Sequence, residues 1–334
     1  MKALVIAEAG VNHNGDSTLA FRLVEAAKEA GADAVKFQLF DATSLVNRKA
    51  PKAAYQLQTT DGAESQFEML RRLELGSDIF YALARHCAEL SLKFIVTPFD
   101  LPSVSFLAGM GLETFKIPSG EITNLPYLRA IGALSREIIL STGMSTLDEV
   151  RAALDVLDLS GTPPEHVTLL HCTTEYPAPF SEVNLRAMKT MYDAFPRIKG
   201  IGYSDHTTGI AVAVAAAALG ATVIEKHFTL DKTMEGPDHK ASLEPDELAL
   251  MIRSIREVEV ALGDGVKTPR ASELKNRDVV RKSIVAAKSI HAGETFSAEN
   301  ITTKRPGTGL SPMLWDLRIG KKAVRAYRAD EEID

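Results

Sequence analysis

Short runs of apolar residues alternate with longer amphipathic segments along most of the chain. Eight of these runs predict β-strands, at residues 4–8, 34–38, 93–97, 114–118, 137–141, 167–172, 199–204 and 222–227. The segments between them have the apolar spacing of helices, and strands that alternate with helices are typical of a parallel sheet. Eight strand–helix pairs ending near Leu262 match the count and length of an α/β (β/α)8 TIM barrel. A doubly wound open sheet is the alternative.

Capping residues predict where several of the helices begin. Ser17 is placed to cap the helix after the first strand, and Ser145, with Asp148 three residues later, the helix after the fifth. Pro245, followed by two acidic residues, predicts the start of the helix after the eighth strand.

The sequence changes in character after the predicted barrel, which we assign to residues 1–262. Residues 263–282 are polar, charged and glycine-containing, which indicates a linker. Residues 283–334 contain short apolar segments broken by Gly and Pro, which indicates a small domain of mostly β character.

Composition and charge narrow the class of protein. With 45% hydrophobic and 25% charged residues the chain is expected to fold, and its net charge of −6 argues against a nucleic-acid partner. The first apolar run is too short for a signal-peptide core, and the longest, Ile210–Leu219, predicts a packed helix rather than a membrane span. Cys87 and Cys172 are expected to be buried and reduced. We therefore expect a cytoplasmic protein without a membrane partner.

Polar side chains gather at the carboxyl ends of the predicted strands, where TIM barrels carry their catalytic residues. Glu8 ends the first strand, and Lys36 and Gln38 end the second on one face because they are two residues apart. Strands three to five end in Thr97, Lys116, Ser119, Glu121 and Ser141. Two lysines and several hydroxyls facing one cavity suit a phosphate or carboxylate. The alternatives are a purely structural pairing of Lys36 with a carboxylate and hydroxyls that only cap helices.

Two histidines follow the last two strands. His206 and His227 are separated by one crossover helix, so both reach the mouth of adjacent strands, and Glu225 lies on the strand face of His227. Two imidazoles beside a carboxylate suit Mn²⁺, Mg²⁺ or Zn²⁺. Histidines that only hydrogen-bond to loops are the alternative. Asp238, in GPDH, suits sugar hydroxyls or an ordinary turn.

Taken together, the motifs resemble the sialic acid synthase family, whose members make nine-carbon 2-keto sugar acids. The matching stretches are AEAGVNHNG, AVKFQ, TPFD, FKIPSGEITNLPYL, STGMS, LLHCTTEYPAP, GYSDHTTG, IEKHFTLDK, GPDH and KRPGTGLSP. They occur in family order from residue 1 to about residue 320. The resemblance implies a barrel followed by an antifreeze-like (SAF) domain, and a domain-swapped homodimer in which that domain covers the partner's active site.

The resemblance also implies roles for individual residues. His206 and His227 would bind Mn²⁺ or Mg²⁺, with Glu225 contacting a water molecule on the metal. Phosphoenolpyruvate would be held by Lys36, Thr97, Lys116, Ser119, Ser141 and Ser204. Thr174 stands at another phosphoenolpyruvate contact, where some relatives have Asn. The sugar would be bound by Gln38, Glu121, Tyr176 and Asp238, with Arg305 reaching in from the other subunit.

The reaction implied is condensation of phosphoenolpyruvate with an N-acylmannosamine-type sugar and loss of phosphate by C–O cleavage. Glu8 is the expected base for addition of water, with Lys36, Lys116 and Glu225 as further catalytic residues. The main expectation is an N-acetylneuraminate synthase acting on N-acetylmannosamine. The alternative is an N,N'-diacetyllegionaminate synthase acting on 2,4-diacetamido-2,4,6-trideoxymannose. A pseudaminic acid synthase, a metal-free Schiff-base aldolase and a non-catalytic sugar- or ice-binding protein fit the motifs less well.

Overall fold

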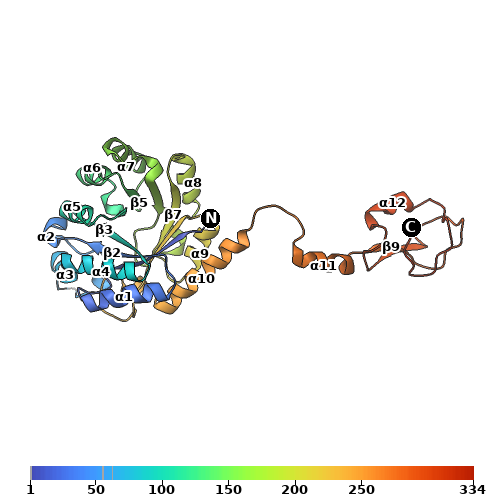
Figure 1. Cartoon of the computed structure of the whole chain (residues 1–334), viewed down its shortest axis with the longest axis horizontal. Helices are drawn as coiled ribbons and strands as arrows, with labels where there is room; N and C mark the ends of the chain where they lie inside the picture. The colour runs from blue at the N-terminus through green and yellow to red at the C-terminus, as the bar shows by residue number, and fades with distance from the viewer. Residues whose placement is uncertain (1, 55, 62) are drawn as a thin grey trace. The chain divides into compact units, whose positions relative to one another are not determined.

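The chain forms two compact units, Met1–Gly263 and Asp264–Asp334, each with its own hydrophobic core (Figure 1). The structure is a computed structural model and describes residues 2–54, 56–61 and 63–334.

The first unit is a closed barrel of eight parallel strands in sequence order, which confirms the predicted TIM barrel. The strands begin and end within two residues of their predicted bounds. They are β1 (Leu4–Gly10), β2 (Ala34–Leu39), β3 (Lys93–Pro98), β4 (Thr114–Ile117), β5 (Glu137–Ser141), β6 (Val167–His171), β7 (Gly200–Asp205) and β8 (Val223–His227).

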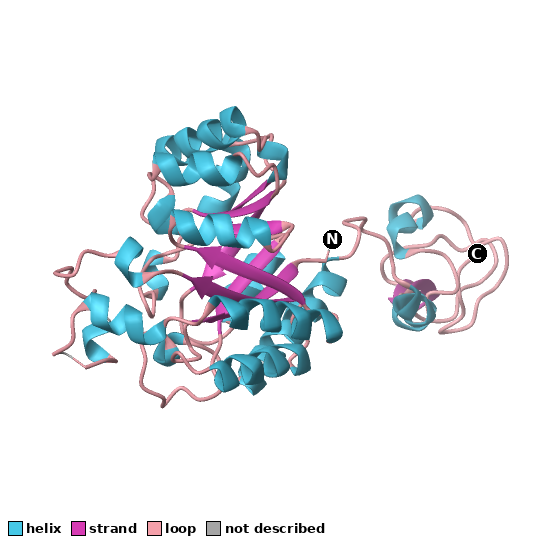
Figure 2. Ribbon diagram, turned by 60° about the vertical axis from the view of Figure 1, so that its left-hand side comes forward, coloured by secondary structure: helices cyan, strands magenta, loops and turns pink. Residues whose placement is uncertain are grey.

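Helices surround the strands, as Figure 2 shows with cyan helices outside the magenta sheet. They are α1 (Ser17–Glu29), α4 (Ser77–Glu89), α5 (Leu101–Gly109), α6 (Leu125–Gly132), α7 (Leu147–Ser160), α8 (Ala187–Ala194), α9 (Ala211–Ala218) and α10 (Pro245–Leu262). The long connection from β2 to β3 contains, in addition to α4, helices α2 (Ala42–Leu45) and α3 (Gln66–Leu73) and the 3₁₀ turn η1 (Gln56–Gln58). Further 3₁₀ turns are η2 (Ser119–Glu121), η3 (Pro164–His166), η4 (Phe180–Glu182) and η5 (His239–Ala241).

Alternation along the strands separates two apolar layers. Val35 and Phe37 point outward into the main core between strands and helices. A smaller cluster fills the barrel interior and consists of Ile6, Ala34, Ile95, Ile139, Leu170 and Val223, with Leu4 packed against it. These interior residues precede the polar strand ends, so they close the barrel beneath the site and exclude water from below.

Two of the predicted helix starts are wrong by one residue. Asp16, not Ser17, caps α1, because Asp16 is extended and its carboxylate accepts hydrogen bonds from the amides of Thr18 and Leu19. Thr146, not Ser145, caps α7 and forms a capping box with Glu149. The start of α10 at Pro245 is confirmed.

The second unit is small and irregular. It begins with the exposed helix α11 (Ala271–Val280), which lies in the stretch expected to be a linker. An antiparallel pair, β9 (Ser283–Ala286) and β10 (Ile301–Lys304), is followed by η6 (Pro312–Leu314) and α12 (Trp315–Arg318). A core that includes Ile284 and Phe296 holds the unit together.

The apolar run around residues 210–219 forms the packed helix α9, with Ala213, Ala216 and Ala217 buried. Within the described residues, none of the helices combines the length and the apolar character needed to cross a membrane. Cys87 and Cys172 are free and buried, as expected.

Candidate active site

A cavity of about 390 Å³ opens at the carboxyl ends of the barrel strands. It is lined by every predicted site residue except Arg305, namely Glu8, Lys36, Gln38, Thr97, Lys116, Ser119, Glu121, Ser141, Thr174, Tyr176, Ser204, His206, Glu225, His227 and Asp238. Arg305 is an exposed residue of the second unit, just after β10. The barrel topology brings the other residues together, since they come from the strand ends and from the loops and turns that follow the strands.

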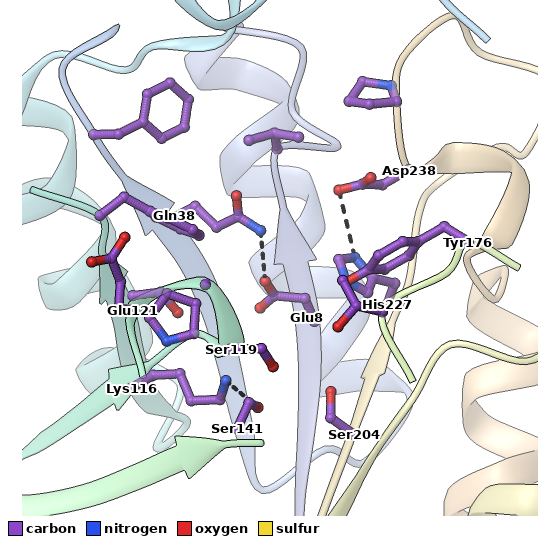
Figure 3. Close-up of a pocket in the computed structure, with 18 of the residues that line it drawn as sticks. Glu8, Gln38, Lys116, Ser119, Glu121, Ser141, Tyr176, Ser204, His227 and Asp238 are labelled. Carbon is purple, nitrogen blue, oxygen red and sulfur yellow. Dashed lines mark hydrogen bonds and ion pairs between the residues drawn. The ribbon is translucent and has the colours of Figure 1, made fainter. Parts of the chain in front are cut away.

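A buried cluster of two lysines and two glutamates forms the floor of the cavity. The Lys36 ammonium lies 2.9 Å from the Glu225 carboxylate and 3.4 Å from that of Glu8. Lys116 lies 3.7 Å from Glu225 and donates a 2.7 Å hydrogen bond to the Ser141 hydroxyl (Figure 3). Lys36 thus pairs with carboxylates, as expected if its role were purely structural, and it also lines the cavity.

Burial and mutual charge shift the pKa values of this cluster in opposite directions. Burial raises the pKa of Glu8 to about 7 and lowers that of Lys116 to about 8. Burial would also lower the pKa of Lys36, but the carboxylates of Glu225 and Glu8 raise it above its usual value. Burial would raise the pKa of Glu225, yet Lys116 and Lys36 hold it below its usual range. The floor therefore holds one firmly ionised pair and two groups that titrate near neutral pH.

Hydroxyl groups above the floor are only partly satisfied within the protein. Ser119 accepts a 2.9 Å hydrogen bond from the Gly143 amide and lies 3.3 Å from the Cys172 sulfur. The hydroxyls of Thr97 and Thr174 are buried and have no hydrogen-bond partner among the described residues. Because unpaired buried polar groups are costly, these two hydroxyls are suited to hydrogen-bond a ligand.

The two histidines lie side by side, with ring centroids 5.7 Å apart. The Nδ1 atom of His206 is 2.6 Å from the Thr173 carbonyl oxygen, which can only accept, so Nδ1 carries the hydrogen and Nε2 keeps its lone pair. The Nδ1 atom of His227 is buried without a hydrogen-bond partner among the described residues and lies 3.8 Å from the Asp238 carboxylate. Burial lowers the pKa of His206 to about 4, so its ring is neutral.

This donor set fits a cation with few protein ligands. A neutral imidazole whose other nitrogen is held by a backbone carbonyl is the usual form of a metal-binding histidine. Among the residues that the structure describes, there is no group of three or more His, Cys, Asp or Glu side chains that could hold a metal ion. The two imidazoles are the candidate direct ligands, and a cation held by them would keep positions for water and substrate.

Polar groups on both sides of the cavity face its centre (Figure 3). Gln38 donates a 3.1 Å hydrogen bond to Glu8, and Glu121 accepts one from Asn124. On the opposite side the Tyr176 ring packs 4.2 Å from that of His206. Burial raises the pKa of Asp238 to about 6.

Sequence reasoning missed one side of the cavity, which we name the apolar wall. It consists of Val11, Phe40, Leu45, Val46, Met69, Leu70, Leu73 and Phe99. The available signal was Phe40, which follows Lys36 and Gln38 at two-residue spacing and lines the same cavity. Its partners on α2 and α3 come from the long β2–β3 connection, which the strand pattern does not resolve.

The remaining barrel histidines lie outside this cavity. His239 is fully buried between the Thr229 hydroxyl, at 2.7 Å, and Asn14, at 3.1 Å, and so fixes the GPDH turn. His13 stacks against Phe37, behind the barrel wall.

Comparison with known proteins shows to which family the chain belongs. The model of the NeuB family matches residues 23–267, and that of the SAF domain matches residues 281–333. The chain belongs to the NeuB family. The resemblance to sialic acid synthases is thereby confirmed, as is the barrel followed by an SAF domain. This NeuB family member is an enzyme of the nonulosonic acid synthase group.

Three relatives illustrate the range of the family. The chain is 55% identical to an N,N'-diacetyllegionaminic acid synthase of Campylobacter jejuni, covering 99% of both chains. It is 47% identical to a Legionella pneumophila protein of the same name, over 93% of this chain and 88% of the relative. The crystal structure of an N-acetylneuraminic acid synthetase from Leptospira borgpetersenii matches with a TM-score of 0.71 and 33% identity, covering 83% of this chain and 90% of that one.

Proposed function

We propose that this NeuB family member is an N,N'-diacetyllegionaminate synthase, which condenses phosphoenolpyruvate with 2,4-diacetamido-2,4,6-trideoxymannose. The observation that carries the proposal is the identity of 55% and 47% to two enzymes named for that product, against 33% to a sialic acid synthetase. The alternative of the sequence analysis thus replaces N-acetylneuraminate as the main expectation. Water is the third reactant, and inorganic phosphate is released.

The anionic substrate fits the lysine floor of the cavity. Lys36 and Lys116 are buried cations that can face a phosphate and a carboxylate, and Glu225 holds both by ion pairing. The hydroxyls of Thr97 and Thr174 can complete the hydrogen bonds of the bound anion, because they lack partners in the protein. A low-dielectric floor strengthens each of these interactions.

Glu8 is the proposed base. Its pKa of about 7 leaves a large fraction ionised at neutral pH while the group remains basic enough to take a proton. The new carbon–carbon bond joins C3 of phosphoenolpyruvate to the aldehyde carbon of the sugar. As this bond forms, the C2–C3 double bond of phosphoenolpyruvate and the C=O double bond of the aldehyde become single bonds. Water adds to C2 and gives a proton to Glu8, which can pass it to the former aldehyde oxygen. The C–O bond to the phosphate then breaks, and the C2 hydroxyl becomes the ketone as its proton leaves with the phosphate. Gln38 holds the Glu8 carboxylate in place by its hydrogen bond.

His206 and His227 are the proposed ligands of Mn²⁺ or Mg²⁺. Such a cation would act as a Lewis acid on the aldehyde oxygen of the open-chain sugar. The Thr173 carbonyl keeps His206 in the tautomer that can bind a cation, and Asp238 and Tyr176 lie beside the two rings, where they can orient the sugar.

Phosphate release measures the proposed reaction directly. The enzyme would be incubated with phosphoenolpyruvate, Mn²⁺ and either 2,4-diacetamido-2,4,6-trideoxymannose or N-acetylmannosamine. We expect the diacetamido sugar to have the higher kcat/KM. A higher kcat/KM with N-acetylmannosamine would reject this proposal and restore N-acetylneuraminate as the product. Reduction by borohydride in the presence of pyruvate should trap no covalent adduct, which separates this chemistry from a Schiff-base aldolase.

We also propose that the enzyme is a domain-swapped homodimer in the cytoplasm. In this dimer, Arg305 of each small domain would serve the cavity of the other protomer. It is supported by the exposure of Arg305 and by its location outside the barrel unit. Mixing His206→Ala and Arg305→Ala protomers tests it, since each mixed dimer would contain one site with both residues intact. Activity above that of either variant alone is expected. If the activity does not rise on mixing, the proposal of a swapped dimer is wrong.

A further inference from the structure

The apolar wall is a cluster separate from the main barrel core. Val11, Phe40, Met69 and Leu73 are buried together, with Leu45, Leu70 and Phe99 packed against them. The Phe40 and Phe99 rings meet edge to face at 6.3 Å. Helices α2 and α3 supply the outer part and contact each other at one side of the barrel (Figure 1). The cluster therefore forms a packed apolar surface that borders the cavity.

Polarity falls from the floor to the rim of the cavity along β2 and the residue that follows it. Lys36, Gln38 and Phe40 all line it at two-residue spacing, so a charge, an amide and an aromatic ring follow one another outward. At about 3.3 Å per residue in an extended chain, the backbone runs roughly 13 Å from Lys36 to Phe40. An acylated open-chain sugar can extend along this row.

The orientation of the sugar follows from its chemistry. Its aldehyde must lie at the floor, near the two histidines and the lysines that hold phosphoenolpyruvate, so its far end lies toward the rim. In the trideoxy sugar of the proposed function that end carries a C6 methyl group and a C4 acetamido group. In N-acetylmannosamine both of these positions carry hydroxyl groups. None of the side chains of the apolar wall carries a hydroxyl, amide or charged group that could bond a sugar hydroxyl packed against them. Gln66, at the start of α3 and outside this cluster, also lines the cavity and can bond the C4 acetamido group.

We infer that the apolar wall binds the C6 methyl end of the sugar and selects 6-deoxy sugars over their 6-hydroxy counterparts. This inference rests on the proposed function and adds the residues that contact the end of the sugar farthest from its aldehyde. A methyl group gains by leaving water for this surface, while a hydroxyl there loses its water without a replacement partner. An apolar site discriminates against an added hydroxyl by about a hundredfold at most, so we expect a preference of roughly 10- to 100-fold in kcat/KM.

Two substrates and three variants test the inference. The substrates are 2,4-diacetamido-2,4,6-trideoxymannose and 2,4-diacetamido-2,4-dideoxymannose, which differ only by the hydroxyl at C6. Leu70→Gln and Leu45→Gln each place an amide in a half-buried position of the wall. Ile79→Gln is the matched control, because Ile79 is a half-buried residue of α4 that packs on the main core and does not line the cavity.

The wild-type enzyme and Ile79→Gln should favour the 6-deoxy sugar by the same factor, and Leu70→Gln should reduce that factor by about 5- to 10-fold. Leu45→Gln should act in the same direction and provides the test if Leu70→Gln does not fold. Equal kcat/KM for both sugars in the wild type, or an unchanged preference in both wall variants, would overturn the inference while leaving the proposed function intact. Phosphate release with neither diacetamido sugar would overturn both.

Discussion

A buried ion pair behind the active site offers a quantitative test of how the barrel is held together. Lys226 and Asp205 are fully buried on the outward faces of β8 and β7, with Nζ 2.8 Å from Oδ2. Lys226 also donates to the Thr207 carbonyl, and the other carboxylate oxygen of Asp205 accepts from the amide and hydroxyl of Thr207 at 3.0 and 2.8 Å. The pair thus joins β8 to the loop that follows β7 just beyond His206.

Replacing Lys226 with Met keeps most of the apolar stem and removes the charge. It leaves the Asp205 carboxylate in the interior without its cation, which typically lowers the free energy of unfolding by about 3–5 kcal/mol. At about 2–4 °C per kcal/mol for a domain of this size, the barrel Tm should fall by roughly 6–20 °C. Adding Asp205→Asn removes the stranded charge and keeps the acceptor for Thr207, so the double variant should recover about 2 kcal/mol.

The two units can be followed separately in this experiment. Trp315 is the single tryptophan and lies in the second unit, so its fluorescence follows that unit, while far-UV circular dichroism follows mainly the helices of the barrel. Urea and thermal unfolding should show the loss in the dichroism signal. A loss below about 1 kcal/mol in Lys226→Met, or a double variant as unstable as the single one, would refute the reasoning.

Three further predictions concern the cavity. His206→Ala should lower Mn²⁺ affinity at least tenfold by calorimetry while leaving the circular dichroism spectrum unchanged; unaltered affinity would exclude His206 as a ligand. The profile of kcat/KM against pH should be bell-shaped, rising through about pH 7 as Glu8 loses its proton and falling above about pH 8 as Lys116 loses its own. A flat profile across this range would contradict those assignments. A methyl group at Gly143 would lie 2.2 Å from the nearest hydroxyl, so Gly143→Ala should raise the KM for phosphoenolpyruvate about tenfold or more, whereas Gly109→Ala, which meets no atom within 4 Å, should leave it unchanged.

The barrel and most of its cavity could be predicted because both follow from local pattern and a fixed topology. Apolar runs of four to seven residues mark the strands, and their two-residue alternation separates Val35 and Phe37 from Lys36 and Gln38. A closed parallel barrel then carries every strand end to the same face. The proximity of polar residues at those ends can therefore be predicted without any further information about the fold.

The features that could not be predicted depend on which distant side chains meet. Met69 in α3 has the helical spacing of an ordinary core residue, and only the folded chain brings it to the cavity beside Phe40. Lys226 stands between two predicted site residues, and nothing in its neighbourhood in the sequence names Asp205 as its partner. At the start of α1, Asp16 and Ser17 are both good capping residues, and the backbone conformation decides between them.

Strand β8 performs two tasks on its two faces, and this limits how its sequence can change. Glu225 and His227 point into the cavity, while Lys226 between them points outward to the buried pair with Asp205. Deleting or inserting one residue in this strand would turn every side chain beyond that point to the opposite face. The lysine would then enter the cavity, and the carboxylate and imidazole would be forced among the helices. New specificities in this enzyme can thus arise by substitution at the rim or by length changes in the β2–β3 connection, but not by sliding β8.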